Sequence, residues 1–375
     1  MTGRHIVAPP APSRHPDARQ QARPPALPTY GALVISLDFE LHWGVRDTKP
    51  ADGSYRKQLL GGRRVVPQLL DLFEEFGIAA TWATVGFLFA SNRRELERFS
   101  PALRPAYADP ALDPYRERIG VDEAEDELHF ASSLIDAIRR RPRQEIATHT
   151  FSHYYCLAPG QDRAAFQADL ESAVGIARAC GVRLRSIVFP RNQHNRAYDD
   201  LLLAAGLSCY RGNPRAWMYA AARPWLARSA RLLDSYVDAA GPHTARWHDI
   251  PQASGLCNVP ASFFLRPCSP RGRWFDKLRH RRLVRSLEWA AAGNEIVHLW
   301  WHPENFGIHT ADNVAFLRAV LEAFARLRET HGMRSLTMAE VAELAQPAAA
   351  GSPTVGRHGA VPNGGWKTKE GVRGT

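Results

Sequence analysis

The sequence of 375 residues predicts an α/β protein built around a parallel sheet, either open or closed into a barrel. From about residue 31 to residue 345, short apolar or β-branched runs alternate with longer segments whose apolar residues recur at helical spacing. Such alternation of strand and helix is typical of parallel sheets. Several of the short runs end in His, Asp or Glu, and the catalytic groups of these folds gather where strands end.

The first half of the chain shows the alternation clearly. ALVISLD (32–38) and IAATWATVG (78–86) are expected strands because both are nearly continuous apolar runs. Between them lies a predicted helix, 63–77, which ends in a glycine, a residue that commonly terminates helices. The segment 122–140 is an expected amphipathic helix and leads into a strand at 145–150.

The pattern continues through the second half with one interruption. Helices are expected at 162–181, 196–206 and 313–329, strands at 185–190, 207–212 and 295–301, and a last strand and helix within 334–345. Residues 213–290 are less regular. Because no internal repeat divides the chain, the elements are assigned to one catalytic domain, residues 29–346.

The two ends of the chain differ from this body. Residues 1–28 are rich in Pro, Ala, Arg, His and Gln, and residues 347–375 in Gly, Pro, Thr and Lys, so both tails are expected to be disordered. Each tail holds four basic residues against one acidic residue, which leaves +4 of the formal net charge of +10 to the body. So small an excess requires no nucleic-acid partner.

The sequence shows no sign of a membrane span or of a secretory signal. It has no 18-residue apolar run, and its first residues lack the apolar core of a signal peptide. Five cysteines, an odd number without a C-x-x-C pair, fit reduced thiols. The protein is therefore expected to be cytoplasmic and to have no transmembrane segment.

Polar residues follow four of the expected strands. Asp38 and Glu40 alternate along the end of the first strand, so both side chains can point the same way. His149 and His153, four residues apart, follow the third strand, and His302 follows a late one. Each has an ordinary structural alternative, such as a helix cap, a loop hydrogen bond or a core histidine. Their joint occurrence at strand ends indicates a reaction site.

The residue types at these strand ends predict metal-assisted hydrolysis. Two imidazoles and one carboxylate, with an open fourth position, form the ligand set of catalytic zinc hydrolases. Such an ion polarises a carbonyl and lowers the pKa of bound water towards ~7. A second carboxylate would take the proton from that water, and a separate histidine would protonate the leaving group. Arg191, after the strand at 185–190, is either part of this site or a surface cation.

These residues resemble the motifs of the NodB-homology polysaccharide deacetylases, carbohydrate esterase family four, in particular the bacterial members associated with surface-polysaccharide gene clusters. The likeness rests on VISLDFE at the first motif, LLDLFEEFGIAATWATVGFLF after it, HTFSH as H-[ST]-x-x-H, and IVHLWWH at the last motif. It covers roughly residues 31–345. It implies a distorted (β/α) barrel of about seven strands and hydrolytic removal of an N-acetyl group from a sugar.

The resemblance also implies roles for individual residues. His149 and His153 would hold a divalent metal ion, usually zinc or a similar ion in this family. Asp38 would act as the base and His302 as the general acid. The ion and a backbone N–H near Tyr154 would stabilise the tetrahedral oxyanion.

The chain departs from the family pattern in three places. The family has two adjacent aspartates where this chain has Asp38 and Phe39, so Glu40 is the substitute metal ligand; the reverse assignment, with Asp38 as ligand and Glu40 as base, stays open. The third motif normally places Arg before Pro, whereas Arg191 follows Pro190, which leaves its part in orienting the base open. YRGNPRAW occupies the approximate place of the fourth motif without its aspartate–tryptophan pair, so the residue that tunes the acid is unassigned.

The expected partner is an N-acetylated sugar in a polysaccharide or its precursor. Trp300 or Trp301 is expected to stack on a sugar ring, and loops from residues 213–290 to line the sugar groove. Two other functions stay open. One is hydrolysis of a different non-peptide C–N bond, as in allantoinase-like relatives of this fold. The other is carbohydrate binding without catalysis, which the departure at Phe39 keeps open.

Overall fold

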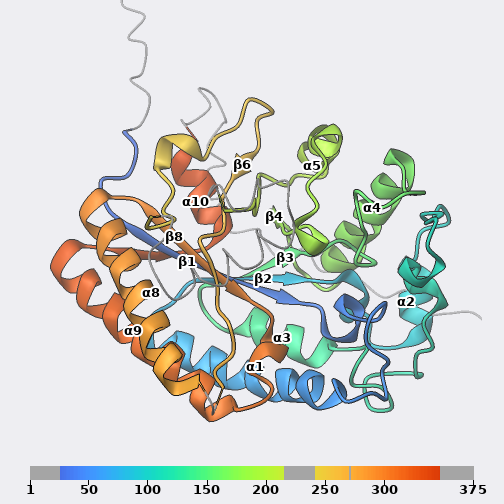
Figure 1. Cartoon of the computed structure of the whole chain (residues 1–375). Coiled ribbons are helices and arrows are strands. Elements are labelled where there is room, and N and C mark those ends of the chain that lie inside the picture. The colour runs from blue at the N-terminus through green and yellow to red at the C-terminus, as the bar shows by residue number, and fades with distance from the viewer. Residues whose placement is uncertain (1–25, 215–240, 270–271, 347–375) are drawn as a thin grey trace, which may run out of the picture. The chain divides into compact units, whose positions relative to one another are not determined.

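Strand β1, Ala32–Phe39, lies near the middle of a nine-stranded sheet (Figure 1). The computed structural model describes residues 26–214, 241–269 and 272–346. The strands follow the order β6-β5-β4-β3-β2-β1-β8-β7, all neighbours are parallel, and β9 pairs with the first half of β1. The other strands are β2 (Ala80–Thr84), β3 (Gln144–Thr148), β4 (Ser186–Ile187), β5 (Cys209–Tyr210), β6 (Cys257–Asn258), β7 (Phe263–Phe264), β8 (Ile296–Trp301) and β9 (Arg334–Leu336).

This curled parallel sheet with its helices confirms the expected distorted (β/α) barrel. The sheet has nine strands where about seven were expected. Strands β6 and β7 were not expected: they span two residues each, as β4 and β5 do, and lie in the stretch 213–290 where the sequence shows no regular pattern.

The helices are α1 (Arg56–Phe76), α2 (Arg93–Phe99), α3 (Ser132–Arg140), α4 (Arg163–Ala179), α5 (Asp199–Ala204), α8 (Arg273–Gly293), α9 (Thr310–His331) and α10 (Met338–Ala345). Short 3₁₀ turns follow several strands, among them η1 (Leu41–Gly44) after β1 and η9 (Pro303–Phe306) after β8. Helices α8 and α9 lie side by side, and α1 packs against α9 and α3 on the same outer side of the sheet (Figure 1). These helices cover the sheet from outside.

β1 divides its side chains between two cores because successive residues of a strand point to opposite faces. Leu33, Ile35, Leu37 and Phe39 pack into the core between the sheet and the outer helices. Ala32 and Val34 belong to a second apolar cluster, which includes residues of α10. Ser36 and Asp38 continue this second face toward the carboxyl end of β1. The alternation thus aims Asp38 away from the helix-covered core.

Two expectations for individual elements are wrong. The helix expected over 122–140 forms only from Ser132 onward, because the Asp122 and Asp126 carboxylates accept bonds from nearby backbone N–H groups and build turns instead. The irregular pattern expected at 213–290 hides the 21-residue helix α8. The buried face of α8 includes Arg279 and Arg282, so its apolar spacing is diluted.

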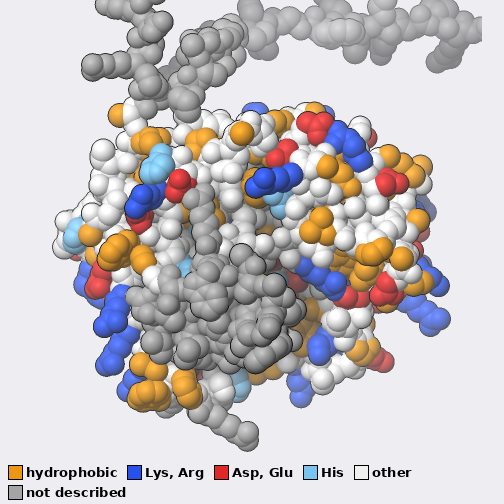
Figure 2. Space-filling model, turned by 45° about the horizontal axis from the view of Figure 1, so that its top comes forward, with side chains coloured by type: hydrophobic (Ala, Val, Ile, Leu, Met, Phe, Trp, Pro, Cys, Tyr) orange, Lys and Arg blue, Asp and Glu red, His pale blue; other side chains and the backbone are white. Residues whose placement is uncertain are grey.

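The predicted disordered tails, 1–28 and 347–375, lie outside the described residues except for 26–28. No helix in the described part of the chain is long and apolar enough to cross a membrane. On the face shown in Figure 2, the described basic and acidic side chains are interspersed. That mixed surface agrees with the small net charge of the body.

Candidate active site

Asp38 and Glu40 stand at the carboxyl end of β1, where the strand passes into η1. Both residues are almost completely buried, with exposed fractions of 3% and 4%. Phe39 between them is fully buried in the outer core, with its ring centroid 6.3 Å from that of Trp82. The position of the family's second aspartate therefore points into the apolar core. The alternation of the strand leaves Glu40 as the acidic residue beside Asp38.

The HTFSH segment forms a tight loop directly after β3. Thr150 and His153 both have positive φ angles, 65° and 57°, a backbone region that non-glycine residues rarely adopt. Asp169 of α4 holds the loop: its carboxylate accepts bonds from the N–H groups of Phe151 (2.7 Å) and Ser152 (3.1 Å) and from the Ser152 hydroxyl. Burial raises the pKa of Asp169 to about 6, against the effect of these three donors. The bonds to Asp169 offset the cost of the strained backbone. This backbone conformation directs His153 back toward β1.

Glu40, His149 and His153 converge on one point. Glu40 Oε2 lies 3.1 Å from Nε2 of His149 and 3.1 Å from Nε2 of His153. All three side chains are buried, and their ligand atoms lie within 4.8 Å of one another. The fold thus brings the two expected histidine ligands, His149 and His153, together with Glu40, the expected substitute ligand.

The protonation states suit a cation at this point. His149 Nδ1–H donates to the backbone oxygen of Val188 (2.8 Å), and this bond directs Nε2 of the ring at Glu40. Burial lowers the pKa of His153 to about 4, so this ring is neutral at pH 7. Burial alone would raise the pKa of Glu40, but the charge of His302 and the two histidine hydrogen bonds hold it well below its usual value. Two imidazoles and an ionised carboxylate form a donor set that fits a divalent ion such as zinc.

Asp38 is paired with a residue that the sequence did not single out. Arg211, immediately after β5, donates from one guanidinium nitrogen to Asp38 Oδ1 (2.6 Å) and from the other to Oδ2 (2.7 Å). The same guanidinium also donates to Ser36 Oγ and to Asn192 Oδ1, each at 3.0 Å. Burial alone would raise the pKa of Asp38, but the neighbouring Arg211 outweighs it and lowers that pKa. Asp38 is therefore an ionised carboxylate of fixed orientation.

Arg191 does not reach Asp38. Its guanidinium forms an ion pair with Asp47 and lies 4.3 Å from the ring centroid of Tyr155, and its side chain is 42% exposed. Arg191 and Asn192 have positive φ angles in the turn after β4, and this turn presents Asn192 to Arg211 instead. Arg191 thus lies near the HTFSH loop, while Arg211 takes the position beside the carboxylate.

His302 approaches both carboxylates from β8. Its Nε2 lies 3.4 Å from Glu40 Oε1 and 3.8 Å from Asp38 Oδ2. Its Nδ1 lies 3.2 Å from Asn305 Oδ1, and because that oxygen only accepts, Nδ1 is the donor. Burial alone would lower the pKa of His302, but the charges of Glu40 and Asp38 raise it. The raised pKa favours a protonated ring, which would present Nε2–H to the site.

Glu304, two residues after His302, was not singled out in the sequence. It is 2% exposed, and its Oε2 has no hydrogen-bond partner among the described residues. Burial raises the pKa of Glu304 to about 8. This side chain is therefore a neutral carboxylic acid at pH 7, held close to the charged groups of the site.

Trp300 and Trp301 point to opposite faces of the sheet, because successive side chains of strand β8 alternate. Trp301 is fully buried against the rings of Phe73 and Phe306 in the outer core, so it is not brought to the site. Trp300 faces the other way and remains partly exposed, with its ring 5.7 Å from that of His302 and 4.2 Å from the guanidinium of Arg211. Of the two, Trp300 is positioned to contact a substrate.

The structure does not bring Tyr154 to the site. Its backbone N–H donates to Thr150 Oγ1 at 2.7 Å, inside the HTFSH loop. Its buried side chain donates to the backbone oxygen of Asp162 at 3.0 Å. Both polar groups that could have faced a substrate already have partners within the protein.

Part of the chain that carries the site matches a known family. The polysaccharide deacetylase family profile matches residues 52–210, a range that includes HTFSH. This matched region belongs to the polysaccharide deacetylase family. The resemblance expected from the sequence is thereby confirmed, and with it the expected class of enzyme, a polysaccharide deacetylase-like hydrolase acting on non-peptide carbon–nitrogen bonds. No curated protein matches the sequence significantly.

Solved structures of other proteins are similar to this chain, the first of them in overall fold. A protein from Mycobacterium smegmatis, provisionally named as a polysaccharide deacetylase, is 17% identical, with a TM-score of 0.54 over 89% of this chain and 99% of that one. A 4-alpha-glucanotransferase from Thermococcus litoralis (10% identity, 84% and 40% of the chains) and Puue allantoinase (12%, 88% and 97%) both have TM-scores of 0.49.

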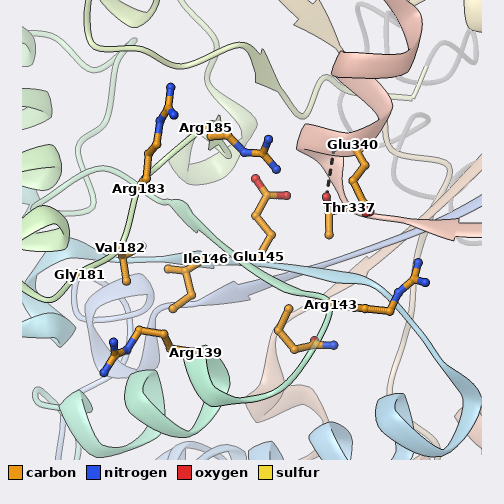
Figure 3. Close-up of a pocket in the computed structure, with 11 residues that line it drawn as sticks. Arg139, Arg143, Glu145, Ile146, Gly181, Val182, Arg183, Arg185, Thr337 and Glu340 are labelled. Carbon is orange, nitrogen blue, oxygen red and sulfur yellow. Dashed lines mark hydrogen bonds between the residues drawn. The ribbon is translucent and has the colours of Figure 1, made fainter. Parts of the chain in front are cut away.

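The structure has a further pocket, of about 310 Å³, at the amino-terminal ends of β3 and β4 (Figure 3). Arg139, Arg143, Arg183 and Arg185 line it around Glu145. Glu145 is already bonded to Thr81, Ser186 and the N-terminus of α10. This pocket lies away from the strand ends that carry the site residues, and its central carboxylate has a structural role.

Proposed function

We propose that the protein removes an N-acetyl group from a sugar by metal-dependent hydrolysis, giving a free amine and acetate. The observation that carries this proposal is the convergence of Glu40, His149 and His153 beside an ionised Asp38 and a protonated His302. The family match supports an acetylated sugar as the substrate class.

The metal ligands would be Glu40, His149 and His153, and zinc is the ion that this donor set suits best. A divalent ion held there would act as a Lewis acid toward the acetyl carbonyl and would acidify the attacking water. The Val188 carbonyl keeps the Nδ1 proton of His149 and thereby fixes the tautomer that leaves Nε2 free to bind. Glu40 takes the place of the family's second aspartate.

Asp38 would be the general base. Its carboxylate is ionised, and the two bonds from Arg211 hold it in one orientation, so it can accept a proton from a water molecule as that water attacks the acetyl carbon. Arg211 would position this base without contacting the substrate. It would take the role that the third-motif arginine has in the family, and Arg191 would not.

His302 would be the general acid. When the tetrahedral intermediate breaks down, the bond between the acetyl carbon and the sugar nitrogen is cleaved, and Nε2–H can protonate the leaving nitrogen. The raised pKa of His302 keeps this proton available at neutral pH. Asn305 fixes the ring by accepting from Nδ1.

The substrate would be a polysaccharide or its precursor, with Trp300 as the aromatic platform for a sugar ring. The place of the reaction in surface-polysaccharide synthesis and the cytoplasmic location stay predictions from the sequence. Loops from residues 213–290 were expected to line the sugar groove. Of these, residues 215–240 are not among the described residues.

The test is acetate release. The full chain, reloaded with zinc after chelation, is incubated with N-acetylated oligosaccharides and, in parallel, with allantoin, and acetate and ring-opened product are measured. Acetate release that is lost in Asp38→Asn supports the proposal. Turnover of allantoin without acetate release would replace it with the second hydrolase function, and zinc binding without turnover of either class would contradict it.

A further inference from the structure

A second group of metal-ligating side chains lies outside the site described above. It consists of His42, His129 and Glu117. His42 lies in η1, Glu117 follows a short 3₁₀ turn, Pro114–Arg116, and His129 precedes α3. The two histidines are buried, with exposed fractions of 1% and 2%. Three segments that are distant in the sequence therefore meet at this group.

The two imidazoles face each other in an arrangement that neutral rings alone do not explain. His42 Nε2 lies 2.8 Å from the backbone oxygen of Lys49, and His129 Nδ1 lies 2.8 Å from Asp126 Oδ2. Because both oxygens only accept, each of these nitrogens is the donor of its ring. In the neutral tautomers of this kind, the remaining nitrogens, Nδ1 of His42 and Nε2 of His129, would direct lone pairs at each other across 2.9 Å. A cation between them removes the repulsion.

Glu117 completes a triangle around this point. Its Oε1 lies 3.7 Å from His42 Nδ1 and 3.8 Å from His129 Nε2. With the 2.9 Å between the two nitrogens, these distances place the three atoms on a circle of about 2.0 Å radius, and its centre is at bonding distance for zinc to nitrogen or oxygen. Among the described residues the Glu117 carboxylate has no hydrogen-bond donor, so it is free to act as a ligand.

The surroundings of the group are those of a built metal site. Asp126 on His129 and the Lys49 carbonyl on His42 are the outer partners that metal-bound histidines usually have. Trp43 Nε1–H donates to the backbone oxygen of His129 (3.0 Å), which fixes the loop against η1. Glu117 also lines a cavity of about 550 Å³, which gives an ion and a water ligand a way in.

We propose that His42, His129 and Glu117 bind a second divalent transition-metal ion, of the zinc type, that joins the segment 112–131 to the end of β1. Two imidazoles and a carboxylate suit zinc, cobalt or nickel rather than magnesium or calcium. The ion has a structural role, because it ties three loops together beside the strand that carries Glu40. The proposal does not depend on the deacetylase activity.

The experiment uses the full chain with the first site removed, His149→Ala with His153→Ala. After chelation, this variant is titrated with Zn²⁺ by calorimetry and with Co²⁺ by visible d–d absorption. One ion per chain is expected, with the intense absorption of a four-coordinate site. Should the double variant fail to fold, as judged by circular dichroism, the same titration is made in Glu40→Gln.

A matched pair of variants identifies the ligands. Glu117→Gln and Glu97→Gln each remove one carboxylate from the wall of the same cavity, but only Glu117 lies near the histidines. In the background without the first site, Glu117→Gln is expected to weaken zinc binding by at least about tenfold and Glu97→Gln to leave it unchanged. Absence of any zinc binding, or equal binding by both variants, would overturn the proposal, and the two histidines would then share a proton.

Discussion

Arg211 holds both carboxylate oxygens of Asp38, at 2.6 and 2.7 Å, although 173 positions separate the two residues in the sequence. The guanidinium is fully buried, and the carboxylate is 5% exposed. A bidentate pair fixes the carboxylate in its plane as well as in its position. This pair therefore sets the orientation of the proposed base.

We expect Arg211→Lys to lower kcat about 100-fold, because a lysine keeps the charge but loses the two parallel bonds that orient Asp38. Arg191→Lys is the matched control, and it should leave kcat nearly unchanged because Arg191 pairs with Asp47. Steady-state kinetics on an N-acetylated oligosaccharide compare the two. If Arg191→Lys had the larger effect, the assignment of the positioning arginine would be wrong.

Asp38→Asn and Glu40→Gln should separate the two carboxylate roles. Glu40→Gln is expected to weaken zinc binding at the first site by more than about 100-fold, because it removes a ligand charge. Asp38→Asn should keep that zinc and lower kcat by about 10²–10⁴, as expected for the loss of a base. Zinc titration and acetate release are measured on both. The opposite pattern would establish the reverse assignment, with Asp38 as ligand.

His302→Gln should lower kcat by about 10²–10⁴ while the zinc content stays that of the parent protein, because the side chain would donate a proton and bind no ion. Glutamine can still hydrogen-bond but cannot transfer a proton at neutral pH. Zinc content by elemental analysis and kcat from acetate release are the two readouts. Loss of zinc in this variant would make His302 a ligand instead of the acid.

The stability of the protein should depend on pH through Glu304. Its pKa is about 8 in the folded protein, against 4.5 for a free glutamate, so the folded state holds the proton more tightly than the unfolded state. The contribution of this group to the free energy of unfolding is therefore largest below pH ~4.5. It decreases as the pH rises from ~4.5 to ~8. The variant Glu304→Gln has no titrating group at this position, so its stability should lack this dependence on pH.

The measurement for Glu304 is the Tm of parent and Glu304→Gln, with metal removed, between pH 5 and 9. We expect the parent Tm to fall relative to that of the variant as the pH rises, because only the parent has to bury a charge. Parallel Tm curves would show that Glu304 is ionised in the folded protein and that its neutral state was inferred wrongly.

The sequence predicted the parts of the site that depend on local order. HTFSH after a strand and Asp38 with Glu40 at the end of another follow from period-two alternation and from the gathering of strand ends at one edge of a parallel sheet. The same alternation also decides which of Trp300 and Trp301 faces the site, once the inward face of β8 is known. The direction of that face depends on the partner strands, which the sequence does not show.

Arg211 could not be predicted because its role depends on where β5 lies relative to β1. The third-motif pattern pointed to Arg191, the arginine beside a proline, whereas the turn after β4 aims Arg191 at Asp47. The one available signal was YRGNPRAW, with an arginine near the end of the strand expected at 207–212. Buried arginines hid α8 in a similar way, because the apolar spacing used to predict helices does not count Arg279 and Arg282 as core residues.

The most direct test of the central claim is the zinc content per chain of the parent protein and of the His149→Ala, His153→Ala double variant, measured by elemental analysis after both are saturated with zinc and freed of excess. The account predicts that the folded double variant holds one ion fewer than the parent and releases no acetate. Equal zinc content in the two proteins would contradict it, because HTFSH would then not be a ligand pair and the proposed hydrolysis would lose its metal.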